Sequence, residues 1–247
     1  LDEHEDAYMA EQLFRRWFLG AVAIGTGRTK AMEYVLTLVD PTGGAGKTRF
    51  FCSLVPEDLR KDSVTLDATD RDSVKVATSY WLVELGELDG TFSKSEASRL
   101  KAFLSSEYDE MRMAYGRSYM KYPRRTAFFA SVNSAAFLPD SSGNRRFWPI
   151  RVTATHHEHG IDVQQAWAQA QDELNRGFRW FLTSEENRLI TERNEGFRAL
   201  SRAVDVLSTI FDATKPANVH MTVTGALARA GFPNPTKNDL NEGARWL

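Results

Sequence analysis

A glycine-rich turn that ends in a lysine and a threonine has the clearest chemical potential in this sequence. It reads DPTGGAGKT from Asp40 to Thr48 and matches the phosphate-loop pattern G-x-x-x-x-G-K-[ST], except that Pro41 replaces the first glycine. Successive backbone N–H groups of such a turn bind phosphate oxygens, the lysine meets the β/γ charge, and the hydroxyl is a magnesium ligand. Proline changes only the corner farthest from the lysine, so we expect phosphate binding to survive. The predicted nucleotide-binding residues are Gly43, Gly44, Ala45, Gly46, Lys47 and Thr48.

Two acids follow a hydrophobic run further along the chain, in WLVELGELDG. Glu84 lies 37 residues after Lys47, and Glu87 follows it closely. That interval is long enough for one helix, one strand and another helix. Acids at the end of a strand are often merely solvated, but behind a Gly-Lys-Thr loop they are placed to hold Mg²⁺ and to orient water. Thr48 and Glu84 are the predicted metal ligands.

Polar residues after a third apolar run complete the predicted catalytic set. Asn133 ends the run RRTAFFASVN, where an amide can orient an attacking water or simply cap a turn. Arg145 and Arg146 follow 12 and 13 residues later. The two arginines have three possible roles, namely pairing with local acids, stacking on neighbouring aromatic rings, or acting as an arginine finger, and the sequence does not separate these.

The most cationic stretch of the chain lies between the acidic run and the asparagine. Basic and tyrosine side chains alternate there, which suits a phosphate backbone with stacked bases; a solvated hairpin is the simpler explanation. Arg124 and Arg125 belong to the same stretch. The predicted DNA-binding residues are Arg112, Tyr115, Arg117 and Lys121.

These residues need a scaffold of alternating strands and helices. Apolar spacing predicts helices at 7–25, 47–55 and 95–113, and buried strands at 33–40, 79–85 and 124–134. This alternation favours an α/β fold with a mostly parallel sheet. After residue 152 the pattern is helical, with Thr183 and Ser184 as an N-cap signal, and a short helix after a threonine cap is expected in the tail.

The bulk composition fits a globular chain of 247 residues with 31 basic and 33 acidic side chains, for a formal net charge of −2. A net charge this close to zero does not attract the whole chain to nucleic acid, so any DNA binding must come from a local basic patch. Its single cysteine, Cys52, excludes an internal disulfide and a cysteine-cluster zinc site, and we expect it to be a small buried hydrophobe. No leader or membrane-spanning run is evident. Because the chain starts with Leu1, we expect it to be a fragment of a longer protein.

Taken together, GGAGKT, YWLVELGELDG, the segment from RLKAFLS to FFASVN, and GNRRFWPIRV resemble the virulence-associated protein E family. These are helicase-like ATPases of phages and mobile islands, similar to superfamily 3 helicases. The resemblance implies a P-loop NTPase fold with an AAA+ core and a helical C-terminal segment. The implied domains are an N-terminal helical segment (1–30), the ATPase core (31–155), a helical segment (156–215) and the start of a small C-terminal domain such as a winged helix (216–247).

The resemblance also implies roles. ATP and Mg²⁺ are the expected cofactors, Glu84 and Glu87 the acidic pair, Asn133 the polar sensor, and one arginine, with Arg146 favoured, the finger that reaches a neighbouring subunit. Partners would be single-stranded or forked DNA and further copies of the chain in a ring, a hexamer, in the cytoplasm of a bacterial host. The implied activity is DNA translocation or unwinding during replication of a mobile element; the alternative is an ATP-switched binding module without unwinding.

Overall fold

The central layer of the molecule is a five-stranded parallel sheet. The computed structural model describes residues 3–86, 88, 94–111, 120–138, 144–198, 202–211 and 221–246. The strands lie in the order β2 (Arg60–Val64), β3 (Leu82–Leu85), β6 (Ala127–Val132), β1 (Val35–Val39) and β7 (Phe147–Arg151), and all neighbours are parallel. Apart from β2, these strands are buried along almost their whole length, which explains their continuous apolar sequences. The predicted α/β class with a parallel sheet is confirmed.

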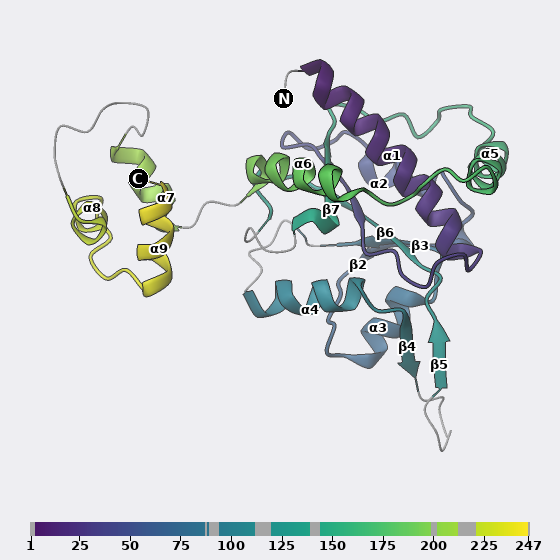
Figure 1. Ribbon diagram of the computed structural model, residues 1–247, viewed down its shortest axis with the longest axis horizontal. Helices are drawn as coiled ribbons and strands as arrows, with labels where there is room; N and C mark the ends of the chain where they lie inside the picture. Colours follow the sequence, from purple (N-terminus) through teal and green to yellow (C-terminus); the bar gives the residue numbers. More distant parts are fainter. Residues whose placement is uncertain are drawn as a thin grey trace. The chain divides into compact units, whose positions relative to one another are not determined.

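Helices cover both faces of this sheet (Figure 1). On one face lie α1 (Glu3–Gly25), α2 (Lys47–Cys52) and α6 (Ser184–Asn194), and on the other lie α3 (Arg71–Thr78) and α4 (Lys94–Leu104). A sixth helix, α5 (Val163–Asn175), packs along α1 through apolar side chains of both helices. Between Lys47 and Glu84 the chain forms α2, β2 and α3, which is the predicted helix, strand and helix.

The side chains of β1 alternate between the two apolar layers. Leu36 and Leu38 pack in the cluster that contains Trp17 of α1, whereas Val35 and Val39 pack in the cluster under α3 and α4. This period of two is what a strand buried on both faces requires. β1, the strand that leads into the predicted phosphate loop, is therefore packed on both faces before that loop begins.

The predicted helix at 95–113 is wrong in its second half. α4 ends at Leu104, and the chain then forms β4 (Tyr108–Met111), which pairs antiparallel with β5 (Met120–Pro123). This two-stranded ribbon lies apart from the central sheet in Figure 1. Helical periodicity misled the prediction because the backbone groups of this segment find their partners in β5, a contact that spacing along one segment does not reveal.

A buried arginine binds the C-terminal end of α4. Arg124 is 2% exposed, and its guanidinium donates to both carboxylate oxygens of Asp109 and to the carbonyl oxygen of Phe103 in the last turn of α4. The guanidinium carbon of Arg124 lies 4.2 Å from the ring centroid of Phe103, which is a cation–π contact. Arg124 therefore joins α4 to the ribbon and is not exposed to a nucleic acid, in contrast to its place in the predicted cationic stretch.

The N-terminus of α6 confirms the predicted cap. The Thr183 hydroxyl accepts a hydrogen bond from the N–H of Glu186, and the Glu186 carboxylate accepts one from the N–H of Thr183, which makes a reciprocal capping box.

The cysteine differs from its prediction. Cys52 was expected to be buried, but it is only half-buried. This partial burial raises the pKa of its thiol.

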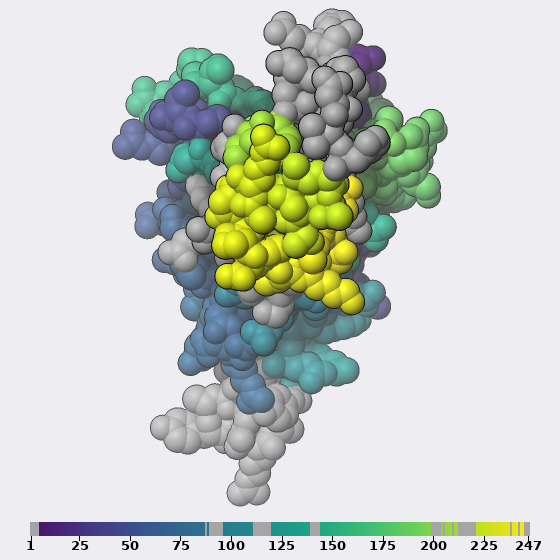
Figure 2. All heavy atoms as spheres, turned by 90° about the vertical axis from the view of Figure 1, so that its left-hand side faces the viewer, coloured from purple at the N-terminus to yellow at the C-terminus, as the bar shows by residue number. Residues whose placement is uncertain are grey.

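The chain divides into two compact units, residues 1–198 and 199–247, so the expected segments 1–30, 31–155 and most of 156–215 belong to a single unit. The second unit contains α7 (Arg202–Ile210), α8 (Val223–Arg229) and α9 (Lys237–Trp246), packed around Leu207 and Leu227. Figure 2 shows these helices as yellow-green to yellow atoms. Thr222 caps α8, as expected for the tail. Residues 202–211 and 221–246 are helical without a strand, so a winged helix stays a prediction.

None of the helices in the described part of the chain combines the length and hydropathy that a membrane span requires.

Candidate functional site

The phosphate-loop candidate lies at the carboxyl end of β1, the edge at which open parallel sheets bind ligands. Gly43, Gly44 and Gly46 have φ values of 74°, 86° and 76°. Side-chain-bearing residues avoid this region, so the loop depends on glycine for its backbone conformation. The N–H groups of Gly44, Gly46 and Lys47 make no hydrogen bond to another described residue, and they are available to a ligand.

Pro41 fits this loop because of a turn. The N–H of Gly43 donates to the carbonyl oxygen of Asp40 over 3.3 Å, which closes a four-residue turn with Pro41 at its second position. Proline is favoured there because its ring presets the required φ. The residue that departs from the loop pattern therefore stabilises the start of the loop.

The buried Asp40 carboxylate accepts hydrogen bonds from three groups of the loop. It is 2% exposed and accepts the Thr42 hydroxyl (2.6 Å), the Thr42 N–H (3.0 Å) and the Ala45 N–H (3.1 Å). The Thr42 hydroxyl, the loop N–H groups and the nearby Lys47 ammonium lower the pKa of Asp40 against the opposing effect of burial. Asp40 was not among the predicted site residues, although an aspartate before a proline is a known turn signal.

The Lys47 side chain joins the loop to β6. Its Nζ atom lies 2.9 Å from Oδ1 of Asn133 and 3.7 Å from Oδ2 of Asp40, and the side chain is only 6% exposed. The buried cation is thus matched by one carboxylate and one amide oxygen. The structure brings together Lys47 and Asn133, two residues that the sequence assigned to one site.

The Thr48 hydroxyl joins the loop to β3. It donates to Oε1 of Glu84 over 2.7 Å, and Glu84 is 3% exposed. These are hard oxygen donors of the kind that Mg²⁺ takes together with water and phosphate oxygens, so the pair fits the expected metal. Among the described residues no cluster of three or more histidine, cysteine, aspartate or glutamate side chains forms an all-protein metal cage.

A bulge in β2 holds the other oxygen of Glu84. The register of β2 on β3 shifts between Lys61 and Val64, and Ser63 in this shift has φ of 50°. Its N–H donates to Oε2 of Glu84 over 3.1 Å. Bulges next to functional sites commonly redirect a backbone or side-chain group in this way. Sequence analysis had no signal for Ser63, because the bulge exists only in the pairing with β3.

The segment after β7 crosses the loop and fixes a peptide group in it. Thr155 donates its N–H (2.8 Å) and its hydroxyl (2.5 Å) to the carbonyl oxygen of Ala45. The N–H of the same residue, Ala45, is held by Asp40, so its two flanking peptide groups are fixed. Thr155 was also missed from the sequence, because it lies 110 residues from Ala45 and in no recognisable motif.

A cavity of about 1440 Å³ lies beside the loop. Its walls include Lys47, Thr48, Glu84 and Asn133, and it extends beside the segment 65–69 and Arg99 of α4. The convergence of a lysine, a hydroxyl, a carboxylate and an amide in this volume suits a phosphate ester with a divalent cation.

The two predicted finger arginines lie elsewhere and differ from each other. Arg146 is 3.0 Å from a carboxylate oxygen of Glu33 and donates to the Ser105 hydroxyl, with its side chain 17% exposed. Arg145 is exposed. Neither arginine lines the cavity, so neither completes this site from within the same chain.

Of the predicted DNA-binding residues, Lys121 alone lies within the part of the chain that the structure describes. Arg112, Tyr115 and Arg117 lie outside the described residues, as does Glu87 of the acidic pair. Lys121 on β5 is 70% exposed and lies 3.3 Å from Glu110 on β4. Such an exposed pair is weak, so the lysine stays available to an anion.

Comparison with known proteins identifies the family. A family model, the virulence-associated protein E-like domain, matches residues 2–199. The chain belongs to this family. No curated protein matches the chain. This virulence-associated protein E-like chain is also similar to two solved forms of one protein, the apo structure of the NrS-1 C-terminal region (residues 305–718) and its A form.

The similarity to these structures is remote. The first has 14% identity and a TM-score of 0.44, and the match covers 81% of this chain and 50% of that chain. The second has 14% identity and a TM-score of 0.41, with 79% and 48% covered. The virulence-associated protein E-like chain thus spans about half the length of these structures.

Proposed function

We propose that this domain hydrolyses ATP at the cavity beside β1, and that it uses the energy to move on DNA during replication of a phage or mobile element. The observation that carries the proposal is the pair of contacts Lys47–Asn133 and Thr48–Glu84, which gather a phosphate loop, an acid and a polar amide from three adjacent strands. We further propose that the sheet is the core of an AAA+ P-loop ATPase, as the family resemblance implies.

Binding of the nucleotide rests on the loop. The N–H groups of Gly44, Gly46 and Lys47 would donate hydrogen bonds to the phosphate oxygens, and the Lys47 ammonium would turn from Asn133 to the β/γ-phosphates. Thr48 and Glu84 would hold Mg²⁺, which supplies charge neutralisation on the phosphates.

Hydrolysis rests on the acid and the amide. A water oxygen attacks the γ-phosphorus, the bond to the β–γ bridging oxygen breaks, and ADP and phosphate leave. Asn133 would orient this water, while one member of the acidic pair, Glu84 or Glu87, would polarise it. The Ser63 N–H and the Thr48 hydroxyl hold the two oxygens of Glu84 in a fixed orientation beside the loop.

Completion of the site requires a second copy of the chain. Since neither Arg145 nor Arg146 lines the cavity, we propose that a neighbouring subunit supplies the arginine in a ring, with a hexamer as the expected size. Arg145 is the better candidate because Arg146 is already paired with Glu33.

The deciding experiment measures ATP hydrolysis of the chain with and without single-stranded DNA, alongside Lys47→Ala and Lys121→Ala. We expect activity in the parent, stimulation by DNA, no activity in Lys47→Ala, and loss of stimulation in Lys121→Ala. DNA binding without turnover would instead identify an ATP-switched binding module. A parent that neither binds nor hydrolyses ATP would refute the proposal.

A further inference from the structure

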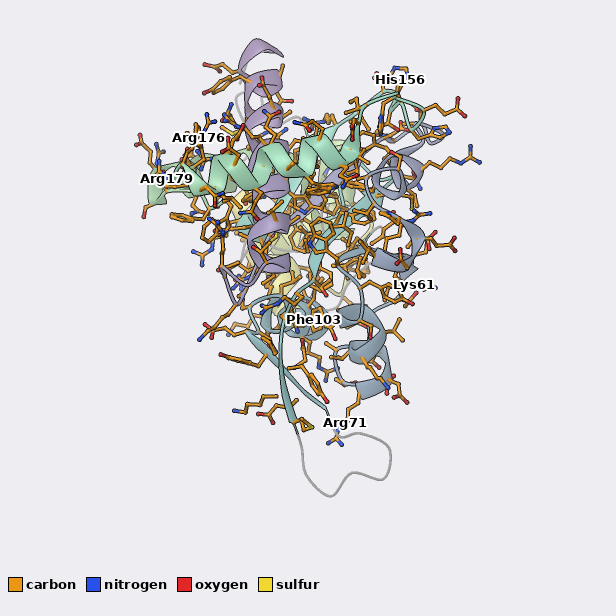
Figure 3. All side chains as sticks on the ribbon, turned by 90° about the vertical axis from the view of Figure 1, so that its right-hand side faces the viewer. Lys61, Arg71, Phe103, His156, Arg176 and Arg179 are labelled. Carbon is orange, nitrogen blue, oxygen red and sulfur yellow. The ribbon has the colours of Figure 1, made fainter. Side chains whose placement is uncertain are left out.

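A second hollow lies on the outer side of α1, away from the nucleotide cavity. It has a volume of about 410 Å³ and is formed by α1 and the turn that ends α5, with Arg15, Arg16, Arg176, Phe178 and Arg179 in its lining. It shares no lining residue with the nucleotide cavity. Figure 3 shows Arg176 and Arg179 at the same end of α5, next to α1, and far from Lys61 and Arg71. We call it the arginine hollow.

The arginines of this hollow differ in how far they are neutralised. Arg16 is committed to Glu186 through two short contacts and is 15% exposed. Arg176 directly follows α5, and in the described part of the chain it pairs with Asp172 of that helix. Both side chains are more than half exposed, so the pair is weak and screened by salt. Arg179 is exposed and makes no hydrogen bond or ion pair with another described residue. Arg176 and Arg179 can therefore bind an anion from outside the chain.

Exposed aromatic rings accompany these cations. Phe178 is 45% exposed and Phe181 is 40% exposed, in the acid-free sequence RGFRWF from Arg176 to Phe181. The guanidinium carbon of Arg15 lies 4.8 Å from the centroid of the Phe178 ring, which fixes that ring at the rim. Arg15 itself is paired with Glu173 over 2.9 Å, so in the described part of the chain the exposed rings lie beside both a paired guanidinium and the weakly paired or unpaired groups of Arg176 and Arg179. Together they form a mixed apolar and cationic patch, a composition typical of interaction sites.

We propose that the arginine hollow binds single-stranded nucleic acid, as a site separate from the ribbon of β4 and β5. Guanidinium groups form planar, bidentate hydrogen bonds to phosphate oxygens, and a flat aromatic ring stacks on a base. Stacking requires a base that is free of its neighbours, which a single strand offers and a duplex does not. This combination distinguishes the surface from a simple anion site, which would need no exposed ring.

The first test compares cation variants of the full chain without nucleotide. Binding of a fluorescent oligothymidine is measured for the parent, Arg176→Ala/Arg179→Ala, and the control Lys61→Ala/Lys75→Ala, which removes two exposed cations elsewhere. We expect affinity to fall about tenfold in the arginine variant only. The slope of log K against log salt should fall by about 1.4, since each single-strand phosphate contact contributes about 0.7. Equal affinity of the arginine variant and the control would overturn the proposal.

The second test examines the ring and the class of ligand. Phe178→Leu retains apolar bulk but removes the stacking surface, so we expect a loss of about fivefold or more in oligothymidine affinity, with an unchanged melting temperature. Duplex DNA and polyglutamate should compete poorly. Competition by polyglutamate as strong as by oligothymidine would identify an acidic peptide as the ligand and overturn the proposal. These binding tests do not depend on ATP hydrolysis, so they are independent of the proposed function.

Discussion

The ammonium group of Lys47 lies 2.9 Å from the amide oxygen of Asn133, although 86 residues separate them in the chain. The contact exists because β1 and β6 are parallel neighbours whose carboxyl ends meet at the same edge. It places the proposed phosphate-binding cation and the proposed water-orienting amide within one hydrogen bond of each other. Hydrolysis would separate their roles, since Lys47 turns to the phosphates and leaves the amide to the water.

We expect Asn133→Ala to separate binding from hydrolysis. Loss of the amide removes the group that would orient water, so kcat for ATP should fall roughly 100-fold, a magnitude typical for one polar group at a transition state. Nucleotide affinity should stay within a few-fold of the parent, because Lys47 and the loop remain. Lys47→Ala is the contrasting variant, with binding itself lost. If the Asn133→Ala protein has the kcat of the parent, Asn133 has no role in the mechanism.

Thr155 should influence nucleotide affinity through the loop. Thr155→Val retains the backbone N–H bond to the Ala45 carbonyl but loses the hydroxyl bond, which leaves the Ala45 peptide less fixed. One such bond contributes about 0.5 to 1.5 kcal/mol, so KM for ATP should rise roughly two- to tenfold with kcat little changed. Thr155→Ser keeps the hydroxyl and should behave as the parent. A valine variant with the parent KM would show that the hydroxyl bond does not fix the loop for binding.

The two finger candidates should separate in a subunit-mixing experiment. Arg145→Ala should lose ATPase activity while retaining nucleotide binding, because a finger contributes about 10³ to 10⁵ in turnover. Mixing it with inactive Lys47→Ala should restore part of the activity, since some sites would combine an intact loop with an intact arginine.

Arg146→Ala should lose about 1 kcal/mol of stability or less from its partly exposed pair with Glu33, seen as a lower melting temperature. If Arg146→Ala shows the catalytic loss and mixing rescue, the assignment is reversed.

Pro41→Gly should weaken nucleotide binding, although it restores the usual loop pattern. Pro41 presets the turn closed by Asp40 and Gly43, and glycine would give the unfolded and unbound loop more freedom. That freedom corresponds to about 0.4 to 1 kcal/mol, or roughly a two- to fivefold weaker affinity if it is lost only on binding. Isothermal titration with a non-hydrolysable ATP analogue measures this. A tighter Pro41→Gly protein would show that proline obstructs the phosphates.

Acid should destabilise the contact between α1 and α6. Burial acts to raise the pKa of Glu186, but hydrogen bonds from Arg16 and Thr183 outweigh it and lower the pKa to about 2, from 4.5. The unfolded chain takes up this proton first, so the stabilisation is complete above pH 4.5 and is lost as the pH falls toward 2.

Because the carboxylate is partly exposed, we expect a loss of about 1 kcal/mol in the free energy of unfolding. Urea titrations from pH 6 to 3 test this against Glu186→Gln, whose stability should vary less over this range. Equal pH profiles would contradict the assignment.

The sequence by itself determined the elements whose signals are local. The glycines at positions 43, 44 and 46 indicate a loop, and they adopt positive φ values. Thr183 and Glu186 indicate the start of a helix, and continuous apolar runs indicate strands that are buried on both faces. In each case the physical cause lies within a few residues of the signal, so spacing and residue type suffice to predict it.

Only the tertiary structure decided which distant groups meet. Placement of β6 between β1 and β3 brings Asn133 to Lys47, and the bulge of β2 brings Ser63 to Glu84. Thr155 reaches the loop only because β7 lies beside β1. Strand order and register arise from packing over the whole sheet, and no local spacing encodes them. For the same reason Arg124, grouped by sequence with surface cations, is found buried against Asp109.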